Sequence, residues 1–215
     1  MLNLLKICAV SDLHGKTFLI PKCNVLAIAG DISVKGDGFW FLRQFLPFLE
    51  DNKHKFDMCL VVFGNHDDSI QLSDVYKDDV PDYVKILNNT AFTYKGVKFF
   101  GSPFTIQSPE IIESMTAFDD DTLGTFYADI PFDTDFLITH MPPYGIGDTV
   151  INQDYHLGSQ NLLARVWCVK PKVHVFGHIH TGKKYTEVNG TKFYNVSLLN
   201  ENYNLVYKPT IINLA

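Results

Sequence analysis

Short apolar runs recur along the chain, and each has the length of a β-strand. Apolar and β-branched residues occupy both faces of these runs, a pattern typical of strands buried in a sheet that is covered by helices. We therefore expect five buried strands at LLKICAV (4–10), VLAIAG (25–30), MCLVVFG (58–64), DFLITH (135–140) and VHVFG (173–177).

Two segments between the runs have the pattern of helices. The segment GFWFLRQFLPFLEDN (38–52) places large apolar residues at helical spacing, and Pro47 is expected to kink or shorten it. The segment SQNLLARVWCVKP (159–171) begins with a capping serine and ends before Pro171. Residues 102–135 are loop-rich and acidic, and we interpret them as a solvated loop, with an active-site lid as the alternative.

Two further segments alternate between apolar and polar residues around a turn. TAFTYKGVKFFG (90–101) turns at Lys95-Gly96, and YTEVNGTKFYNVS (185–197) turns at Asn189-Gly190. Turns of this kind favour antiparallel hairpins. The chain is therefore predicted to be an α/β protein with mixed sheets, in which helices join parallel strands and hairpins add antiparallel ones.

The length of the chain and its net charge limit the classes of protein to which it can belong. A chain of 215 residues with 46% hydrophobic content and no break in composition predicts a single domain over residues 1–215. The formal net charge of −6, without long blocks of either sign, argues against a broad nucleic-acid or anionic-membrane surface. The run MLNLLKICAV lacks the features of a signal peptide, and no segment reaches transmembrane length. We therefore expect a cytoplasmic protein.

Metal-binding side chains follow each of the five apolar runs. One such histidine would more often be structural, but in an open α/β sheet the C-terminal strand ends share an edge where ligands bind. Residues far apart in the sequence can therefore converge there. The candidates, in chain order, are Asp12, His14, Asp31, Asn65, His66, Asp67, His140, His178 and His180.

This donor set limits the choice of ion. Carboxylate, amide and imidazole donors without a thiolate suit manganese, iron or zinc. The donors outnumber the four that a tetrahedral ion needs. Two ions about 3.5–4 Å apart that share a carboxylate would use them all, and such a pair activates a bridging water and clamps a phosphoryl group. The residues thus favour a dinuclear centre.

Five ordered motifs resemble those of the calcineurin-like metallophosphoesterases: DLH, GD, GNHD, a lone histidine after a strand, and GHIH. The segments ITHMPPYGIGD, GSQNLLARVWCVKPKVHVFGHIHTG and YNVSLLNENYNLVYKPTIINL resemble the MPPED-type metallophosphodiesterase branch, so the resemblance extends over nearly the whole chain. It implies a metallophosphoesterase sandwich of two mixed β-sheets flanked by helices, with a dinuclear metal site at the C-terminal strand ends.

The resemblance also implies a role for each motif residue. His66 would stand outside the metal shell as general acid or phosphate donor, with Asp67 orienting it. Two divalent ions are implied, with manganese expected and iron or zinc as alternatives. One ion would be held by Asp12, His14, Asp31 and His180, and the other by Asp31, Asn65, His140 and His178, so that Asp31 bridges the pair.

The implied reaction is hydrolysis of small phosphodiesters by a metal-bridging hydroxide, with nucleotides or cyclic nucleotides as the expected substrates. The alternatives are a phosphomonoesterase, a DNA nuclease of the SbcD kind, and a non-catalytic scaffold like the retromer subunit with this fold. The segment GDISVKG lacks the Asp-Arg pair found in the GDxxDRG motif of Ser/Thr protein phosphatases, which argues against that activity. We expect no stable binding to nucleic acid and none to membranes.

Three segments are predicted to line the substrate pocket because they follow or flank metal-bearing strand ends: MPPYGIGD (141–148), YHLGS (155–159) and NVSLLNENY (195–203). Asn65 and His66 are expected to contact the phosphate. Tyr144 is expected to stack on a base, and Asn195 or Asn200 to bond to the edge of the base. Ordinary turn and strand roles are the alternative.

Overall fold

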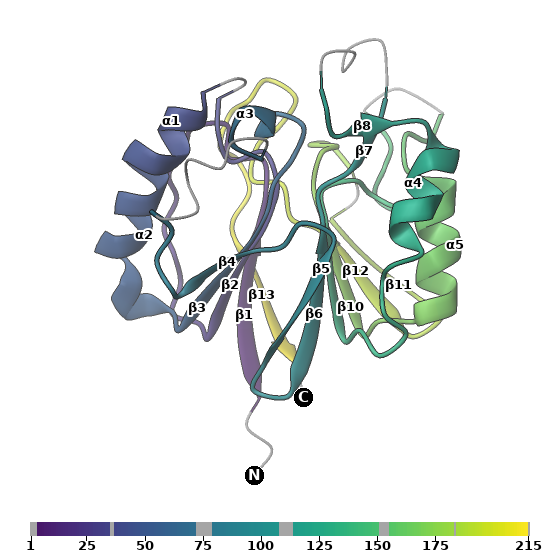
Figure 1. Cartoon of the computed structure of the whole chain (residues 1–215), viewed down its shortest axis with the longest axis horizontal. Helices are drawn as coiled ribbons and strands as arrows, with labels where there is room; N and C mark the ends of the chain where they lie inside the picture. Colours follow the sequence, from purple (N-terminus) through teal and green to yellow (C-terminus); the bar gives the residue numbers. More distant parts are fainter. Residues whose placement is uncertain are drawn as a thin grey trace.

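Two mixed β-sheets face each other at the centre of the molecule, and helices lie on their outer sides (Figure 1). The computed structural model describes residues 4–34, 37–71, 79–107, 114–150, 155–182 and 184–214. Within these ranges the first sheet has five strands and the second has six. The predicted α/β sandwich of two mixed sheets is confirmed.

The first sheet is built on four parallel strands. Its strands, in order across the sheet, are β13 (Thr210–Leu214), β1 (Leu5–Val10), β2 (Val25–Ala29), β3 (Met58–Val62) and β4 (Val84–Ile86). Strand β13 pairs antiparallel with β1, and the other neighbours are parallel. Every residue of β2 is buried, as its continuous apolar sequence predicts.

The second sheet combines four parallel strands with two antiparallel edges. Its strands, in order, are β11 (Tyr185–Val188), β12 (Thr191–Asn195), β10 (Val173–Phe176), β9 (Phe136–Thr139), β6 (Val97–Ser102) and β5 (Thr90–Tyr94). Strands β11 and β5 pair antiparallel with their neighbours. A small parallel pair, β7 (Thr105–Ile106) and β8 (Ala117–Phe118), stands apart from both sheets.

The two antiparallel edges are the predicted hairpins. At the β5–β6 turn φ is 47° for Lys95 and 80° for Gly96, and at the β11–β12 turn φ is 51° for Asn189 and 83° for Gly190. Positive φ at both central residues marks a type I′ turn, whose twist matches that of paired strands. Both hairpin predictions are confirmed.

The core between the sheets joins residues from both. Leu60 and Val62 of β3, Ile138 of β9 and Val175 of β10 belong to one apolar cluster and have no exposed surface. Full burial of a side chain of this kind stabilises the fold by about 1.5–3 kcal/mol. Two more apolar clusters pack each sheet against its helices. The strand ends are therefore held in fixed positions.

A helix of changing pitch covers the outer face of the first sheet (Figure 1). It comprises α1 (Gly38–Trp40), the π-helical segment η1 (Phe41–Phe45) and α2 (Leu46–Asp51), and a 3₁₀ turn, η2 (Lys53–Lys55), follows. Pro47 has no N–H to donate, and its ring would crowd the carbonyl one turn earlier. The wider π-helical segment ends at Phe45, two residues before Pro47. The predicted helix is confirmed, and Pro47 coincides with a change of pitch rather than an end.

Helix α5 (Gln160–Val169) covers part of the outer face of the second sheet (Figure 1). The Ser159 hydroxyl caps it by accepting a hydrogen bond from Leu162 N, and the helix ends at Lys170, before Pro171, as predicted. In the part of the chain that the structure describes, no helix has the length and apolarity needed to cross a bilayer.

Helix α4 (Asp120–Tyr127) packs beside α5 and corrects the interpretation of residues 102–135 as a loop. The acidic run begins this helix: the Asp119 carboxylate accepts a hydrogen bond from Thr122 N, and two more aspartates occupy the first turn. Negative charge is favourable there because the helix dipole is positive at its N-terminus. Residues 108–113 of this stretch lie outside the described ranges.

His174 in β10 is a titratable side chain in the core, without exposed surface. Its Nε2 lies 2.8 Å from Thr139 Oγ1, and its ring packs against Phe176 and Phe193. Burial lowers the pKa of His174 from 6.5 to about 3. The folded protein therefore keeps this imidazole neutral under conditions in which the unfolded chain protonates it.

We expect the metal-free protein to lose stability as the pH falls below 6.5, because there the unfolded chain binds a proton at His174 and the folded chain does not. At about pH 5 this group alone lowers the free energy of unfolding by about 2 kcal/mol. Urea unfolding at about pH 7.5 and about pH 5, with chelator, should show a smaller acid loss in His174→Phe than in the wild type. Equal losses would contradict the prediction, and the exposed His54→Ala variant is the control.

Candidate metal centre

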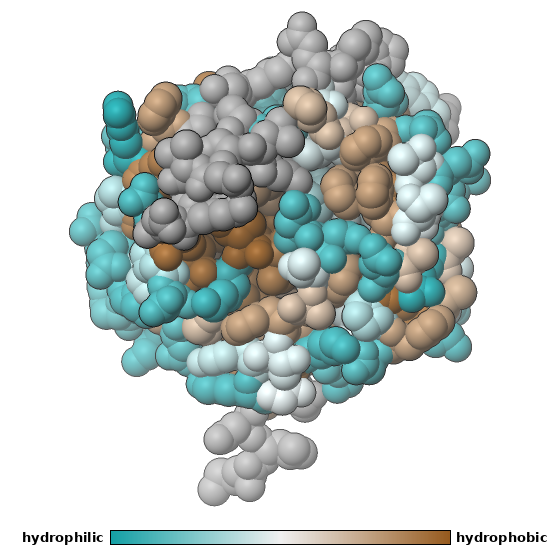
Figure 2. Space-filling view, viewed as in Figure 1, coloured by the Kyte–Doolittle hydropathy of each residue, from teal (hydrophilic) through white to brown (hydrophobic). Residues whose placement is uncertain are grey.

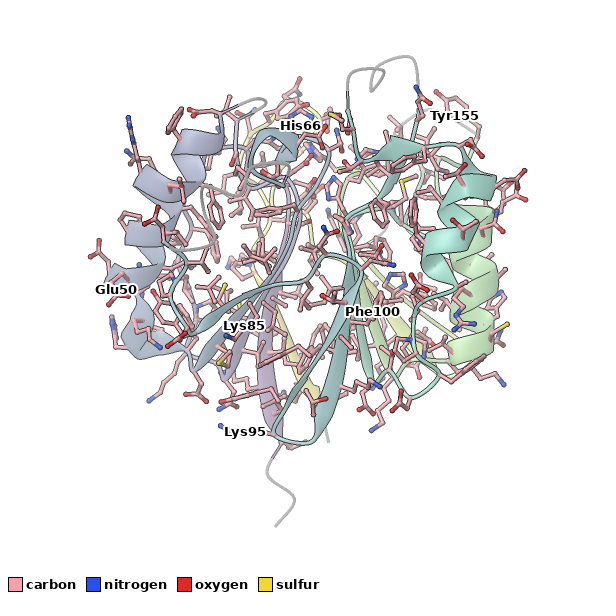
Figure 3. The ribbon with its side chains drawn as sticks, in the orientation of Figure 1. Glu50, His66, Lys85, Lys95, Phe100 and Tyr155 are labelled. Carbon is pink, nitrogen blue, oxygen red and sulfur yellow. The ribbon has the colours of Figure 1, made fainter. Side chains whose placement is uncertain are left out.

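The predicted metal-binding side chains converge at one edge of the molecule. Strands β1, β2 and β3 are parallel in one sheet, and β9 and β10 are parallel in the other. The C-terminal ends of β2 and β9 are in contact across the two sheets, since His140 Nδ1 lies 2.8 Å from Ala29 O. His66, which follows β3, lies at this edge, and the hairpin residue Lys95 lies at the opposite one (Figure 3).

Three side chains form a first ligand group. Asp12, His14 and His180 hold their potential ligand atoms within 4.8 Å of one another. His180 Nε2 lies 3.5 Å from Asp12 Oδ1 and 3.3 Å from His14 Nε2. Ligand atoms that share one ion at about 2.1 Å lie about 3–3.5 Å apart, so this group has the spacing of a metal site.

A second ligand group adjoins the first. It contains Asp31, His140 and His178, and Asn65 joins it through Oδ1, 3.1 Å from His140 Nε2. Asp31 Oδ1 lies 3.3 Å from His140 Nε2, while Asp31 Oδ2 lies 3.6 Å from His14 Nε2 in the first group. Asp31 thus turns one oxygen toward each group, as a bridging ligand would.

Backbone carbonyls fix which nitrogen of two histidines faces these acids. His140 Nδ1 lies 2.8 Å from Ala29 O, and His180 Nδ1 lies 3.0 Å from Asn200 O. A carbonyl can only accept, so Nδ1 carries the proton and Nε2 of the neutral ring presents a lone pair. These lone pairs meet carboxylate oxygens, an arrangement that needs a cation or a proton between them. The donor set therefore fits divalent metal ions, whose histidine ligands are commonly oriented in this way.

The pKa values of the buried groups in the metal-free centre also favour a bound cation. Burial lowers the pKa of His140, but Asp31 and Asp12 outweigh it and raise that pKa to about 9. Burial raises the pKa of Asp31, but the neighbouring histidines, His140 first, hold it well below its ordinary value. A proton on His140 thus offsets part of the buried negative charge. Metal binding should displace that proton, since ligating imidazoles are neutral.

The backbone is strained where the ligands lie. The angle φ is 54° at Asp12, 42° at His14, 53° at Asp31 and 67° at His178. A non-glycine residue in this left-handed region costs about 1–3 kcal/mol and persists only where its surroundings hold it. The strain accompanies the sharp turns that follow β1, β2 and β10.

Two glycines allow the sheets to meet at the centre. A Cβ atom on Gly30 would clash with the His140 ring, and one on Gly64 would clash with Asp31 Oδ1. The glycines of the GD and GNHD motifs are therefore required by close packing.

Comparison with known proteins agrees with this geometry. The sequence profile described as calcineurin-like phosphoesterase matches residues 5–182. The chain belongs to the calcineurin-like phosphoesterase family. The resemblance predicted from the five motifs is thereby confirmed, and membership supports metal-dependent hydrolysis of phosphoesters.

Relatives of this chain include proteins of the predicted branch. Human metallophosphoesterase domain-containing protein 1 is 28% identical over 241 residues, covering 95% of this chain and 69% of that protein. A UPF0046 protein of Caenorhabditis elegans is 44% identical over 86 residues, covering 40% of this chain. The chain spans only 22% and 17% of the length of two curated relatives that it matches. The solved structure of TT1561 of Thermus thermophilus shares the fold, with a TM-score of 0.66, 14% identity, and coverage of 90% of this chain and 89% of that one.

His66 lies at the rim of the candidate metal centre. Its Nε2 is 4.0 Å from Asp31 Oδ2, and its ring is 4.7 Å from that of His14. Its side chain is 22% exposed, against 8% for His14 and 0% for His140, so it is the most solvent-accessible of these three histidines. His14, Asp31 and His66 also form a potential ligand group. A position outside the metal shell therefore stays a prediction.

Asp67 binds backbone amides instead of His66. Its Oδ1 accepts a hydrogen bond from Ser33 N at 2.8 Å, and its Oδ2 accepts from Gly64 N at 3.0 Å and Ile32 N at 3.1 Å. Burial, reinforced by the charge of Asp31, raises the pKa of Asp67 to about 6. This corrects the prediction that Asp67 orients His66, because both oxygens tie the loop after β2 to the loop after β3.

The side-chain amide of Asn195 forms its hydrogen bonds within the protein. It is 2% exposed. Its Nδ2 donates to Ile179 O and Gly147 O, and its Oδ1 accepts from Lys184 Nζ and Ser197 N. This corrects the prediction that Asn195 bonds to a base, because its amide is already satisfied within the protein.

Asn200 shapes a turn. Its side-chain Oδ1 accepts hydrogen bonds from the backbone N–H groups of Asn202 and Asn204, and its carbonyl receives His180 Nδ1. The contact of Asn200 with a base stays a prediction, and its backbone carbonyl supports the candidate metal centre by holding His180. Within the stretch 195–203, sequence reasoning singled out the two asparagines and not Tyr203, whose ring contacts His14 and His180.

Tyr144 stays a candidate for the substrate pocket. It is 37% exposed, and its ring lies 4.9 Å from that of His156. His156 Nδ1 is 2.8 Å from a carboxylate oxygen of Asp148, which is fully buried and holds the loop. Tyr155, next in sequence to His156, lies at the same edge as His66 (Figure 3). This loop therefore borders the edge that carries the centre.

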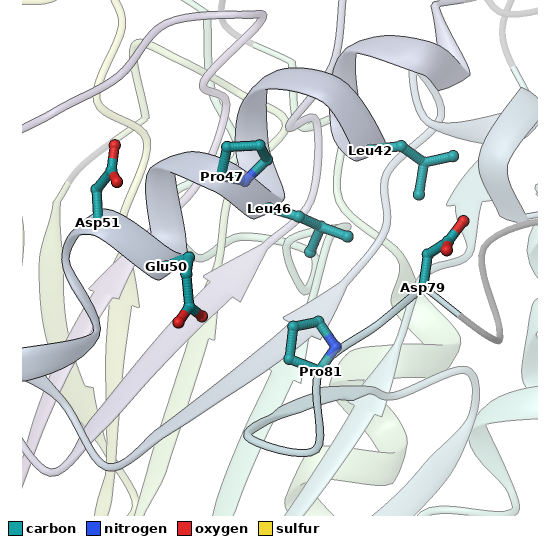
Figure 4. A pocket seen from close by; sticks show the side chains of 7 residues that line it. All are labelled: Leu42, Leu46, Pro47, Glu50, Asp51, Asp79 and Pro81. Atoms are coloured by element: carbon teal, nitrogen blue, oxygen red, sulfur yellow. The ribbon is translucent and has the colours of Figure 1, made fainter.

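A hollow of about 500 Å³ lies elsewhere, against α2 (Figure 4). Strongly hydrophobic residues gather left of centre in Figure 2, in the region that Figure 1 shows between α2 and β4. The charged residues that line the hollow are Glu50, Asp51 and Asp79, and no residue of the two ligand groups lines it. Carboxylates repel phosphate, so the hollow does not fit a phosphoester substrate.

Proposed function

We propose that the protein hydrolyses small phosphodiesters and that its substrates are nucleotides or cyclic nucleotides. The observation that carries the proposal is the position of Asp31, which turns one oxygen toward each ligand group, beside the partly exposed His66. Family membership supports the broader activity on phosphoesters. Manganese as the bound ion and a cytoplasmic location stay predictions.

Different residues of the chain would serve different parts of the hydrolysis. Divalent ions bound at the two groups would activate water at neutral pH and stabilise charge on the phosphoryl group. Asp31 holds the two groups together, and the carbonyls of Ala29 and Asn200 keep the lone pairs of His140 and His180 directed at the centre. The imidazole of His66 reaches solvent and is placed to donate a proton to the leaving oxygen, a step usually worth about 10²–10⁴ in rate.

The charge of the chain supports a small substrate. Proteins that bind long nucleic acids draw affinity from many Lys and Arg contacts with phosphates, whereas this chain has a net charge of −6. Lys184, a basic residue close to His180, donates hydrogen bonds to His180 O, Asn195 Oδ1 and Ser197 O. A single phosphate needs fewer cationic contacts, which bound metal ions and His66 would provide.

We expect the purified protein with manganese to prefer bis-p-nitrophenyl phosphate over p-nitrophenyl phosphate by at least about tenfold in kcat/KM, a ratio that one changed contact can give. It should also prefer cyclic nucleotides over duplex and single-stranded DNA. Steady-state kinetics on this panel measures both ratios. A higher kcat/KM for DNA than for every cyclic nucleotide would replace the proposal with a nuclease, and a preference for the monoester would replace it with a phosphomonoesterase.

A further inference from the structure

The turn formed by residues 200–204 brings an aromatic side chain onto the metal centre. The ring of Tyr203 lies 4.8 Å from the ring of His14 and 5.2 Å from that of His180, edge to face in both cases. Both histidines belong to the first ligand group. Tyr203 is nevertheless 48% exposed, so part of its surface faces solvent beside the centre.

The same backbone group anchors Tyr203 and a metal-binding histidine. Tyr203 N donates to Asn200 O at 2.9 Å, and the same carbonyl lies 3.0 Å from His180 Nδ1. The Asn200 side chain closes the turn by accepting from the N–H groups of Asn202 and Asn204. The turn thus fixes the backbone of Tyr203 relative to His180 of the first ligand group.

The backbone at Tyr203 is unfavourable for a bulky residue. Its φ is 59°, in the left-handed region that glycine adopts freely and asparagine tolerates. Local folding preference alone would therefore favour glycine or asparagine here. The presence of tyrosine is better explained by what its side chain does at the centre.

We propose that Tyr203 is a specificity-determining residue that receives the planar group of a phosphodiester substrate, a nucleobase or an aryl ester, on the exposed part of its ring. The inference rests on the proposed function, because that function places the phosphate at the metal centre. Stacking on an aromatic ring tolerates any base, since each has a π-face. Tyr203 should therefore select aromatic over alkyl esters without selecting one base.

The test compares two diesters with the same leaving group, bis-p-nitrophenyl phosphate and methyl p-nitrophenyl phosphate. Wild-type protein should prefer the first in kcat/KM, and Tyr203→Gly should reduce that preference by about tenfold, the size of one stacking contact. The kcat/KM for the methyl ester should fall by less than that for the bis ester, since the methyl ester has no second ring to stack. Tyr203→Asn, which also suits the left-handed backbone, should behave like Tyr203→Gly and serves if the glycine variant fails to fold.

Lys170→Gly is the matched control. Lys170 also has a left-handed backbone, with φ of 55°, and it ends α5 at the start of the segment that leads into β10, far from the C-terminal strand ends. This variant should leave the preference unchanged.

Calorimetry in the presence of manganese measures binding separately from the kinetics. Tyr203→Gly should lose about tenfold in affinity for adenosine 5′-monophosphate and should keep its affinity for ribose 5-phosphate.

The outcomes separate this inference from the proposed function. An unchanged kinetic preference and unchanged affinity ratio in both Tyr203 variants would overturn the inference, leaving Tyr203 as a cover for the histidines. Lower manganese affinity in both variants with no change in either ratio would overturn it as well. If wild-type protein hydrolyses neither diester, the proposed function fails. The ratio of the affinities for adenosine 5′-monophosphate and ribose 5-phosphate then still tests the role of Tyr203.

Discussion

Asp31→Asn should lose bound metal and hydrolysis together. The carboxylate places Oδ1 3.3 Å from His140 Nε2 and Oδ2 3.6 Å from His14 Nε2, so it belongs to both ligand groups. An amide keeps the shape, but it is neutral and replaces one acceptor oxygen with an N–H donor, so it can serve one group at most. We expect kcat to fall by more than about 10³-fold, because changes behind the metal ligands already cost about 10–100-fold.

Elemental analysis of protein incubated with manganese, together with kcat for bis-p-nitrophenyl phosphate, measures both effects. Asp57→Asn is the matched control: this carboxylate is 47% exposed and pairs with Lys95, at the edge opposite His66 (Figure 3). It should keep metal and activity. Chelator should make wild-type protein behave like Asp31→Asn, and manganese should then restore only the wild type. Two ions per chain in Asp31→Asn would contradict the bridging role.

The donors of the centre could be predicted because strand direction alone brings them together. Asp12, Asp31 and His140 each follow a largely apolar strand, and parallel strands place their C-terminal ends at one edge. Neither step needs knowledge of side-chain contacts. The same holds for the hairpins, whose turn residues adopt the positive φ that their sequences favour.

Roles that depend on hydrogen-bond partners could not be predicted in the same way. Asp67 follows His66 in the sequence, yet its oxygens accept hydrogen bonds from the backbone amides of Ser33 and Gly64. In a turn, two consecutive residues can direct their side chains toward different partners. Asn195 ends a strand beside the centre, but its amide is satisfied inside the protein. Sequence position indicates where such a group lies and says nothing of what it binds.

Two misses have local causes. The acidic run at Asp119 resembles a solvated loop by composition, but the same residues form a helix start when a carboxylate accepts from Thr122 N. Tyr203 lies in a left-handed turn that its own residue type does not favour, so no propensity rule points to it. Each case required the backbone conformation before the side chain could be interpreted.

His66→Ala should keep the metal ions and lose rate, the opposite combination to Asp31→Asn. The His66 side chain is 22% exposed, and its Nε2 lies 4.0 Å from Asp31 Oδ2, farther than the ring nitrogens of His14 or His140 from the same carboxylate. Loss of a general acid at this rim should lower kcat by about 10²–10⁴. Metal content should match the wild type, and His54→Ala, an exposed histidine on the 3₁₀ turn, should change neither quantity.

The size of the loss should depend on the leaving group. p-Nitrophenolate departs without a proton, whereas the alkoxide released from a cyclic nucleotide needs one, so a missing general acid slows the second reaction more. The ratio of kcat for the two substrates should therefore shift against the cyclic nucleotide in His66→Ala. Equal losses on both substrates would instead favour a contact with the phosphate, which both share. Loss of bound manganese would place His66 among the metal ligands, a position that its distance from Asp31 and His14 also allows.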